Sequence, residues 1–163
     1  MKTTLMILSI LLASSAMAQE AEVSETTPAV PASKQFPRYA TLKKGEVNVR
    51  SGPGNEYPTL WIYQRAGYPV QLLARYDNYY KIRDAEAEEG WAYVGMISAT
   101  KGGLVGGKQP APLFRKADIA STMVAKLAPD VVVELKECEG ALCKVEAAGY
   151  KGWIEKARLL MVE

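Results

Sequence analysis

The chain has 163 residues, a formal net charge of +2 and no histidine. A nearly neutral chain lacks the basic surface that binds nucleic acid or holds an anionic membrane. Without histidine it also lacks the usual general base of serine and cysteine peptidases and the usual zinc ligand. The composition therefore predicts no cofactor, no metal site and no catalytic activity of those classes.

Residues 1–18 have the pattern of a secretory signal peptide. Lys2 gives a positive start, residues 5–12 are almost all apolar, and Ala16-Met17-Ala18 is a small-x-small cleavage signal. The apolar run is short for a membrane anchor, which needs roughly 20 apolar residues. Cleavage after residue 18 leaves 145 of the 163 residues. We therefore expect a secreted, periplasmic protein with no membrane span after cleavage.

Residues 19–35 are predicted to form a disordered linker. Glutamate, threonine, proline and serine dominate the segment, and only Val23 and Val30 are sizeable apolar residues. Such a composition cannot bury enough surface to offset the entropy cost of ordering the chain.

The first folded unit is predicted to span residues 36–105 and to be all-β. Val47-Asn48-Val49-Arg50 alternates as a half-buried strand does, and the turn residues 51–55 end it. Asp77-Asn78 is typical of a two-residue hairpin turn. Short strands with turn signals every 8 to 12 residues indicate a small barrel or sandwich. Further strands are expected at 59–64, 69–75, 79–83 and 90–94.

Two glycine pairs, at 102–103 and 106–107, flank Leu104-Val105. We interpret Leu104-Val105 as a short strand that closes the first unit, and residues 106–109 as a flexible joint. The second unit is then expected at 110–163, with one short helical turn within 155–160. Its strands are expected at 113–115, 121–127, 131–135, 143–147 and 152–154.

The second unit repeats the first. Residues 66–83 align with 129–146 at an offset of 63 without a gap, and Glu89-Gly90-Trp91-Ala92 aligns with Lys151-Gly152-Trp153-Ile154 at an offset of 62. An internal repeat of this kind predicts two copies of one small β unit. It favours a binding or scaffolding role over an enzyme with a single pocket.

The segment Val47-Asn48-Val49-Arg50-Ser51-Gly52-Pro53-Gly54, with Gly90-Trp91-Ala92-Tyr93-Val94 downstream, resembles the bacterial SH3-like (SH3b) family, in particular its secreted tandem proteobacterial type. The second unit keeps Gly152-Trp153-Ile154 but has Lys116-Ala117-Asp118 in place of Gly-Pro-Gly. The resemblance implies two tandem barrels of five or six strands. Several members of the family bind peptidoglycan or its stem peptides, and others act as spacers beside a catalytic domain.

The candidate ligand-binding residues lie in the first unit: Arg50, Tyr57, Trp61 and Tyr79. Arg50 shares a strand face with Asn48 near the loop, where it either contacts a ligand carboxylate or braces the loop. Gly52 and Gly54 are expected to adopt positive φ so that the chain turns sharply after the strand.

Aromatic residues are concentrated in the first unit, while Trp91 and Trp153 are expected in the cores. The additional aromatic residues form either an exposed binding face or the contact between the two units. The residues concerned are Tyr57, Trp61, Tyr63, Tyr68, Tyr76, Tyr79, Tyr80 and Tyr93.

Cys138 and Cys143 flank a four-residue segment that contains Gly140-Ala141. If Gly140-Ala141 is a two-residue turn, the two cysteines face each other across a hairpin, close enough for a disulfide. Two cysteines in a secreted chain favour such a bridge. A redox-active pair is the alternative, but the sequence lacks Cys-x-x-Cys spacing and a helix start that would lower a thiol pKa.

Carboxylate catalysis is the remaining enzymatic alternative, because Asp84, Glu86, Glu88 and Glu89 lie together. The second copy has Ala147-Ala148-Gly149 at this place, so a solvated acidic loop is the preferred interpretation. We therefore expect a non-enzymatic binding module of the cell envelope that recognises peptidoglycan or its stem peptides. A protein–protein adaptor for another secreted protein is the alternative.

Overall fold

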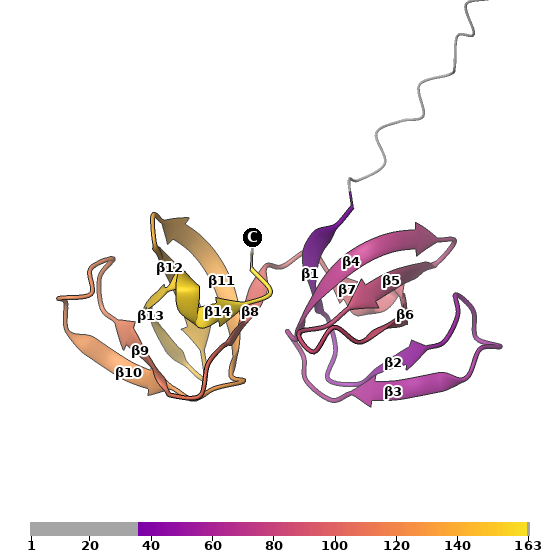
Figure 1. Cartoon of the computed structure of the whole chain (residues 1–163), viewed down its shortest axis with the longest axis horizontal. Coiled ribbons are helices and arrows are strands. Elements are labelled where there is room, and N and C mark those ends of the chain that lie inside the picture. Colours follow the sequence, from indigo (N-terminus) through magenta and orange to yellow (C-terminus); the bar gives the residue numbers. More distant parts are fainter. Residues whose placement is uncertain (1–35, 163) are drawn as a thin grey trace, which may run out of the picture. The chain divides into compact units, whose positions relative to one another are not determined.

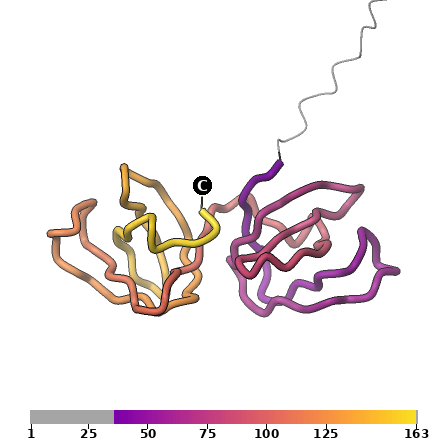
Figure 2. The backbone as a smooth tube through the Cα atoms, viewed as in Figure 1, coloured from indigo at the N-terminus to yellow at the C-terminus, as the bar shows by residue number. Residues whose placement is uncertain are grey.

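The computed structural model describes residues 36–162. The expected signal peptide (1–18) and linker (19–35) lie outside the described residues. Within the described range the chain forms strands, loops and two short 3-10 turns, which confirms the all-β class (Figure 1). Successive strands turn back on one another, so that the backbone follows two similar paths (Figure 2).

The first sheet has seven strands in the order β3-β2-β6-β5-β4-β1-β7. All the strand pairs in it are antiparallel. The strands are β1 (Arg38–Leu42), β2 (Val47–Arg50), β3 (Thr59–Tyr63), β4 (Pro69–Tyr76), β5 (Tyr79–Arg83), β6 (Glu89–Tyr93) and β7 (Ile97–Ser98), and the turn η1 (Val94–Met96) precedes β7.

The second sheet repeats this topology in the order β10-β9-β13-β12-β11-β8-β14. The expected helical turn within 155–160 is present as the 3-10 turn η2 (Lys156–Arg158). The strands are β8 (Gly102–Val105), β9 (Ala111–Phe114), β10 (Met123–Leu127), β11 (Val132–Glu139), β12 (Leu142–Ala147), β13 (Tyr150–Glu155) and β14 (Leu159–Leu160).

Strand β8 belongs to the second sheet, whereas the sequence analysis expects Leu104-Val105 to close the first unit. β8 pairs with β11 and β14, as β1 pairs with β4 and β7, so β8 is the first strand of the second copy. The glycines are there because the strand is crowded. A Cβ on Gly102 would lie 2.7 Å from Cγ2 of Thr41 and 3.1 Å from the carbonyl oxygen of Val133.

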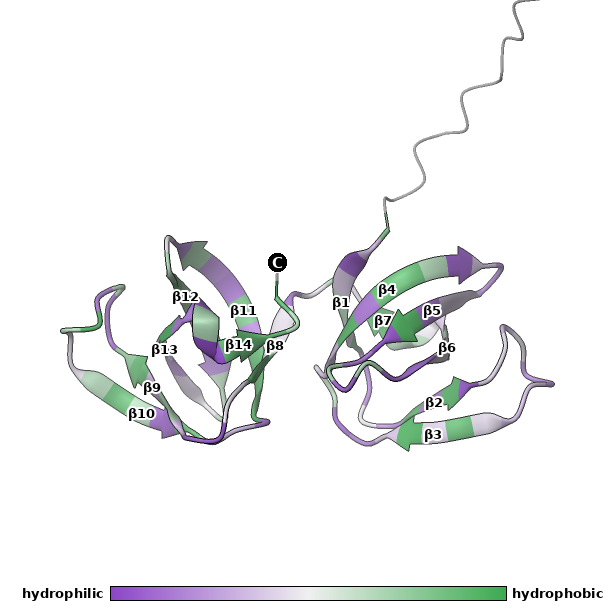
Figure 3. Ribbon diagram, in the orientation of Figure 1, coloured by the Kyte–Doolittle hydropathy of each residue, from purple (hydrophilic) through white to green (hydrophobic). Residues whose placement is uncertain are grey.

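The two hydrophobic clusters follow from the alternation of side chains along the strands. On β2, Val47 and Val49 are buried and the residues beside them are not. Strands β4 and β11 also carry both apolar and polar residues, although without strict alternation (Figure 3). On β8 the two neighbours divide between the clusters, Leu104 packing in the first and Val105 in the second. Strand β8 therefore contributes to both cores.

The Gly-Trp sequence of each copy marks a close approach between strands. A Cβ on Gly90 would lie 2.3 Å from Cγ1 of the buried Val49. A Cβ on Gly152 would lie 2.6 Å from the carbonyl oxygen of Phe114. Only glycine lets these strands pass at this distance, which explains why the repeat keeps the glycine in both copies. The tryptophans that follow differ, because Trp153 is buried as expected whereas Trp91 is only half-buried.

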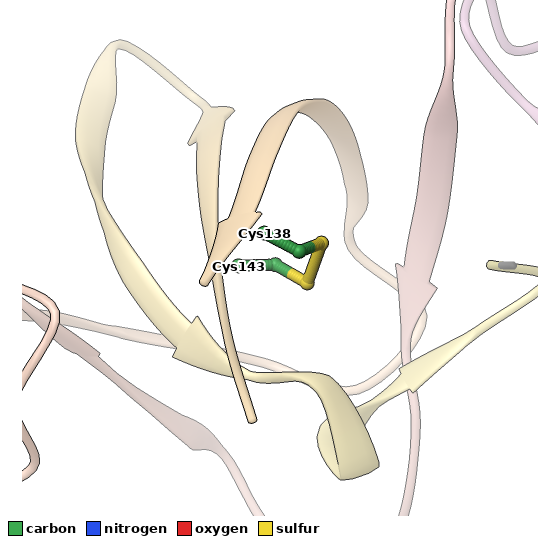
Figure 4. The surroundings of a disulfide bond; sticks show 2 residues. All are labelled: Cys138 and Cys143. Atoms are coloured by element: carbon green, nitrogen blue, oxygen red, sulfur yellow. A yellow bond between two sulfur atoms is a disulfide. The ribbon is translucent and has the colours of Figure 1, made fainter. Parts of the chain in front are cut away.

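The predicted disulfide is present. Cys138 and Cys143 pair across the β11–β12 hairpin, and their Cα atoms are 3.9 Å apart (Figure 4). The 63-residue offset places Arg75 and Tyr80 at the same two positions of the first copy, where they also face each other across a hairpin. There the guanidinium carbon of Arg75 lies 5.7 Å from the centroid of the Tyr80 ring. A cation–π contact and a disulfide thus occupy equivalent positions.

Candidate functional site

The candidate site begins on the solvent-facing side of β2. Val47 and Val49 point into the core, so Asn48 and Arg50 on β2, and Glu46 directly before it, lie at the alternate positions on the opposite face. Glu46 and Asn48 are exposed and Arg50 is half-buried. This face therefore carries an acid, an amide and a guanidinium in a row.

The loop between β2 and β3 is held by hydrogen bonds to Arg50, at the end of this row of residues. Arg50 donates from Nη1 to the carbonyl oxygen of Tyr57 at 2.8 Å and to that of Asn55 at 3.3 Å. Tyr79, which is buried on β5, donates its hydroxyl hydrogen to Oδ1 of Asn55 at 2.8 Å. Arg50 therefore braces the loop, as one of its two interpretations predicts. Its other N–H groups make no hydrogen bond to any described residue.

The expected positive φ of Gly52 and Gly54 is wrong. Neither glycine is among the residues with positive φ, and both are buried beneath the loop's own side chains. A Cβ on Gly52 would lie 2.3 Å from the ring of Tyr57, and one on Gly54 would lie 2.2 Å from the carboxylate of Glu56. These glycines are needed because the loop folds over them, which the sequence alone does not distinguish from a backbone requirement.

A row of tyrosines borders the loop. Tyr76 faces Tyr79 across β4 and β5, and Tyr79 faces Tyr93 across β5 and β6. Residues directly opposite each other in an antiparallel pair share one face of the sheet. The rings of Tyr79 and Tyr93 meet edge to face at 5.9 Å, and Tyr76 and Tyr93 are 63% and 46% exposed. The first copy therefore presents a strip of aromatic surface.

A cavity of about 240 Å³ lies between the β2 row and this aromatic strip. Of the predicted site residues it brings together Arg50 and Tyr79, and it adds Asn55 and Tyr93, which sequence reasoning did not select. The register of β4, β5 and β6 was the missing signal. The residues around the cavity are Glu46, Val47, Asn48, Arg50, Asn55, Tyr79, Tyr93 and Met96.

The other two candidate residues stand apart from the cavity. Tyr57 contributes its backbone carbonyl to the brace, and its ring covers Gly52. Trp61 pairs with the inward-facing Val49 and packs against the first core, on the opposite face from Arg50. Trp61 is therefore a structural residue at the edge of the barrel.

The acidic loop after β5 is more ordered than a solvated loop. Asp84 is buried, and its Oδ1 accepts hydrogen bonds from the backbone N–H groups of Glu86 and Glu88. Tyr63 donates to Oδ2 of Asp84 at 2.7 Å, and Tyr68 donates to Glu86 at 3.1 Å. Burial, reinforced by the bond to Asp84, raises the pKa of Tyr63 far above its usual value of 10.0. The carboxylates of Asp84 and Glu86 thus help to hold the loop.

Other kinds of site are not seen within residues 36–162. That part of the chain holds no cluster of three or more side chains suited to bind a metal ion. None of its helices is long and apolar enough to cross a membrane.

A comparison with solved structures found two with a weak similarity to this chain. They are NlpC2 and NlpC1 from Trichomonas vaginalis, each 16% identical to this chain, with TM-scores of 0.35 and 0.34. The matches cover 78% and 79% of this chain but only 49% and 47% of those proteins, so the chain spans about half of their length. At such scores these likenesses carry no argument about function. No curated protein matches the chain significantly.

The profile of the bacterial SH3 domain matches the chain twice, at residues 43–99 and 107–160. The two matches cover most of the two seven-stranded sheets, and together they account for more than half of the sequence. The tandem arrangement inferred from the internal repeat is confirmed. The chain therefore belongs to the bacterial SH3 domain family.

Proposed function

We propose that this protein is a secreted, non-enzymatic binding module of the bacterial cell envelope, and that its first domain recognises peptidoglycan or its stem peptides. The observation that carries the proposal is the cavity between the β2 row and the tyrosine strip, where Arg50, Asn55, Tyr79 and Tyr93 meet. Family membership adds weight, because SH3-like domains of bacteria commonly bind the cell wall.

The chemistry of the cavity fits a peptide joined to sugar. Tyr93 offers an exposed ring on which a sugar or an apolar side chain can pack. The N–H groups of Arg50 that do not bond to the loop carbonyls can bind a carboxylate, because guanidinium groups bind carboxylates through charge-assisted hydrogen bonds. Because Arg50 also fixes the loop, the donors are held in place before the ligand arrives, which lowers the entropy cost of binding.

A pull-down with purified murein sacculi tests the proposal. Tyr93→Ala removes exposed aromatic surface at the cavity and should reduce the bound fraction at least fivefold. Tyr150→Ala is the matched control, because Tyr150 is also exposed but lies in the second domain. Circular dichroism should show both variants folded. Wild-type protein that stays in the supernatant, or equal retention of the two variants, would contradict the proposal.

The alternative function is an adaptor for another secreted protein, and one observation favours it. Strand β3 lies at the edge of the first sheet and exposes Leu60 and Ile62. At the corresponding position of β10 the second copy carries Lys126, and an edge lysine discourages pairing with other strands. If Ile62→Lys abolishes capture of a secreted partner while sacculi are not bound, the adaptor takes the place of the cell-wall module.

A further inference from the structure

The row on β2 has a polarity along its length. Glu46, Asn48 and Arg50 occupy every second position, and all three border the same cavity. A strand rises about 3.3 Å per residue, so the Cα atoms of Glu46 and Arg50 are about 13 Å apart. The cavity is therefore acidic at one end and basic at the other, with an amide between the two charges.

Neither charge has an ion-pair partner among the described residues. Within residues 36–162, the ion pairs do not include Glu46 or Arg50. Arg50 donates only to backbone carbonyls, and the side chain of Glu46 makes no hydrogen bond to the described residues. Other charged residues of the same sheet do pair, as Glu89 does with Lys81 and Arg83. The two cavity charges are thus free to meet opposite charges on a ligand.

The second copy shows that the fold does not need this row. Val47 and Val49 correspond to Ala111 and Leu113, because each pair is buried and holds the same place in the ladder with β3 or β10. The alternate positions Glu46, Asn48 and Arg50 then correspond to residues without charge or amide: Pro110, Pro112 and Phe114.

We propose that the cavity of the first domain selects a dipolar ligand, a short extended peptide with a free ammonium group at the Glu46 end and a free carboxylate at the Arg50 end. Asn48, between the charges, can both donate to and accept from a peptide bond. The inference deepens the proposed function, on which it rests, by naming the chemistry of the recognised group. It implies that a ligand lacking either charge binds more weakly.

Trialanine and its two capped forms provide the test. An extended tripeptide spans about 10 Å and carries both charges, whereas N-acetyl-trialanine lacks the ammonium and trialanine amide lacks the carboxylate. NMR titration of the whole secreted protein should show trialanine binding about fivefold more tightly than either capped form. Chemical shift changes should be confined to the residues around the cavity, which lie on and just before β2, in the loop after it, and on β5, β6 and η1.

Variants assign each end of the ligand. Glu46→Gln should remove the preference for trialanine over its N-acetyl form and keep the preference over the amide. Arg50→Gln should do the reverse. Glu155→Gln, which removes an exposed acid in the second domain, should change neither ratio. Because the side chain of Glu46 has no hydrogen-bond or ion-pair partner within residues 36–162, its variant separates recognition from loss of structure.

Two results would overturn the inference: no shift changes with trialanine at millimolar concentration, or equal affinities for all three peptides. Binding to purified sacculi distinguishes failure of this inference from failure of the proposed function. Protein that binds sacculi but shows no preference among the peptides retains the proposed function and loses the inference. If the protein shows both preferences but does not bind sacculi, the inference holds and the cell wall is not the source of the ligand.

Discussion

Replacing Gly152 with alanine should strongly destabilise the second domain. The new Cβ would meet the carbonyl oxygen of Phe114 at 2.6 Å and Cγ of the fully buried Leu113 at 2.7 Å. Ordinary contacts to a Cβ are 3.4–4 Å, so β13 must move away from β9. Overpacking costs about 1–3 kcal/mol and a lost ladder hydrogen bond about 1 kcal/mol. We expect a loss of about 3 kcal/mol, which is roughly a third to all of the stability of about 3–9 kcal/mol expected for about 60 residues.

Urea denaturation measures the effect if Trp61 and Trp91 are first replaced by phenylalanine, because Trp153 is then the only tryptophan left. Gly45→Ala in the first domain, followed by circular dichroism in the wild-type background, is the control, since the nearest atom to its new Cβ would be 3.9 Å away. It should leave the free energy of unfolding within about 0.5 kcal/mol of the parent. If Gly152→Ala is equally harmless, the strands do not approach as described and the explanation of the Gly-Trp sequence is wrong.

Three further predictions concern other parts of the chain. Gly52→Ala should lower the free energy of unfolding by about 1–2 kcal/mol in the wild type and by almost nothing in a Tyr57→Ala background, because the new Cβ meets the ring of Tyr57. An equal loss in both backgrounds would mean that the backbone conformation of Gly52, and not the ring, requires glycine. Replacing both Cys138 and Cys143 with alanine should leave a folded protein with a lower melting temperature and a free energy of unfolding lower by about 2 kcal/mol, because the loop is short. Mass spectrometry of the wild type should show two hydrogens fewer than in the reduced form, and free thiols would refute the bridge. Burial raises the pKa of Tyr63, so its contribution to stability is complete below pH 10 and is lost as the pH rises further. Denaturation curves at pH 9 to 12 should therefore show a steeper loss of unfolding free energy for the wild type than for Tyr63→Phe. Parallel losses of unfolding free energy would contradict this.

Local patterns predicted much of the fold. The alternation in 47–50, the turn at Asp77-Asn78 and the hairpin that pairs the cysteines all depend on neighbours in sequence. Strand β1 and the membership of β8 were missed because they depend on pairing between distant segments. Gly102 and Gly103 do not look like strand residues when the sequence is taken alone, and only the packing of Gly102 against Thr41 and Val133 shows why a strand carries a glycine there.

The candidate site was predictable only in part for the same reason. Arg50 and Tyr79 could be selected as a polar residue near a loop and an aromatic near a hairpin. Trp61 was selected with them because the sequence does not show that it pairs with Val49 across the sheet and therefore lies on the core-facing side. Tyr93 joins the cavity through the register of β5 and β6, which no local pattern specifies.

The equivalence of the Arg75–Tyr80 and Cys138–Cys143 positions means that the two copies mature by different chemistry. The contact between Arg75 and Tyr80 forms as soon as the first hairpin folds, whereas the second hairpin gains its cross-link only when an oxidant removes two electrons and two protons from the thiols. The first copy contains neither cysteine, so its folding is independent of the thiol-oxidising machinery. A reductant accordingly loosens one domain and leaves the domain with the candidate cavity intact.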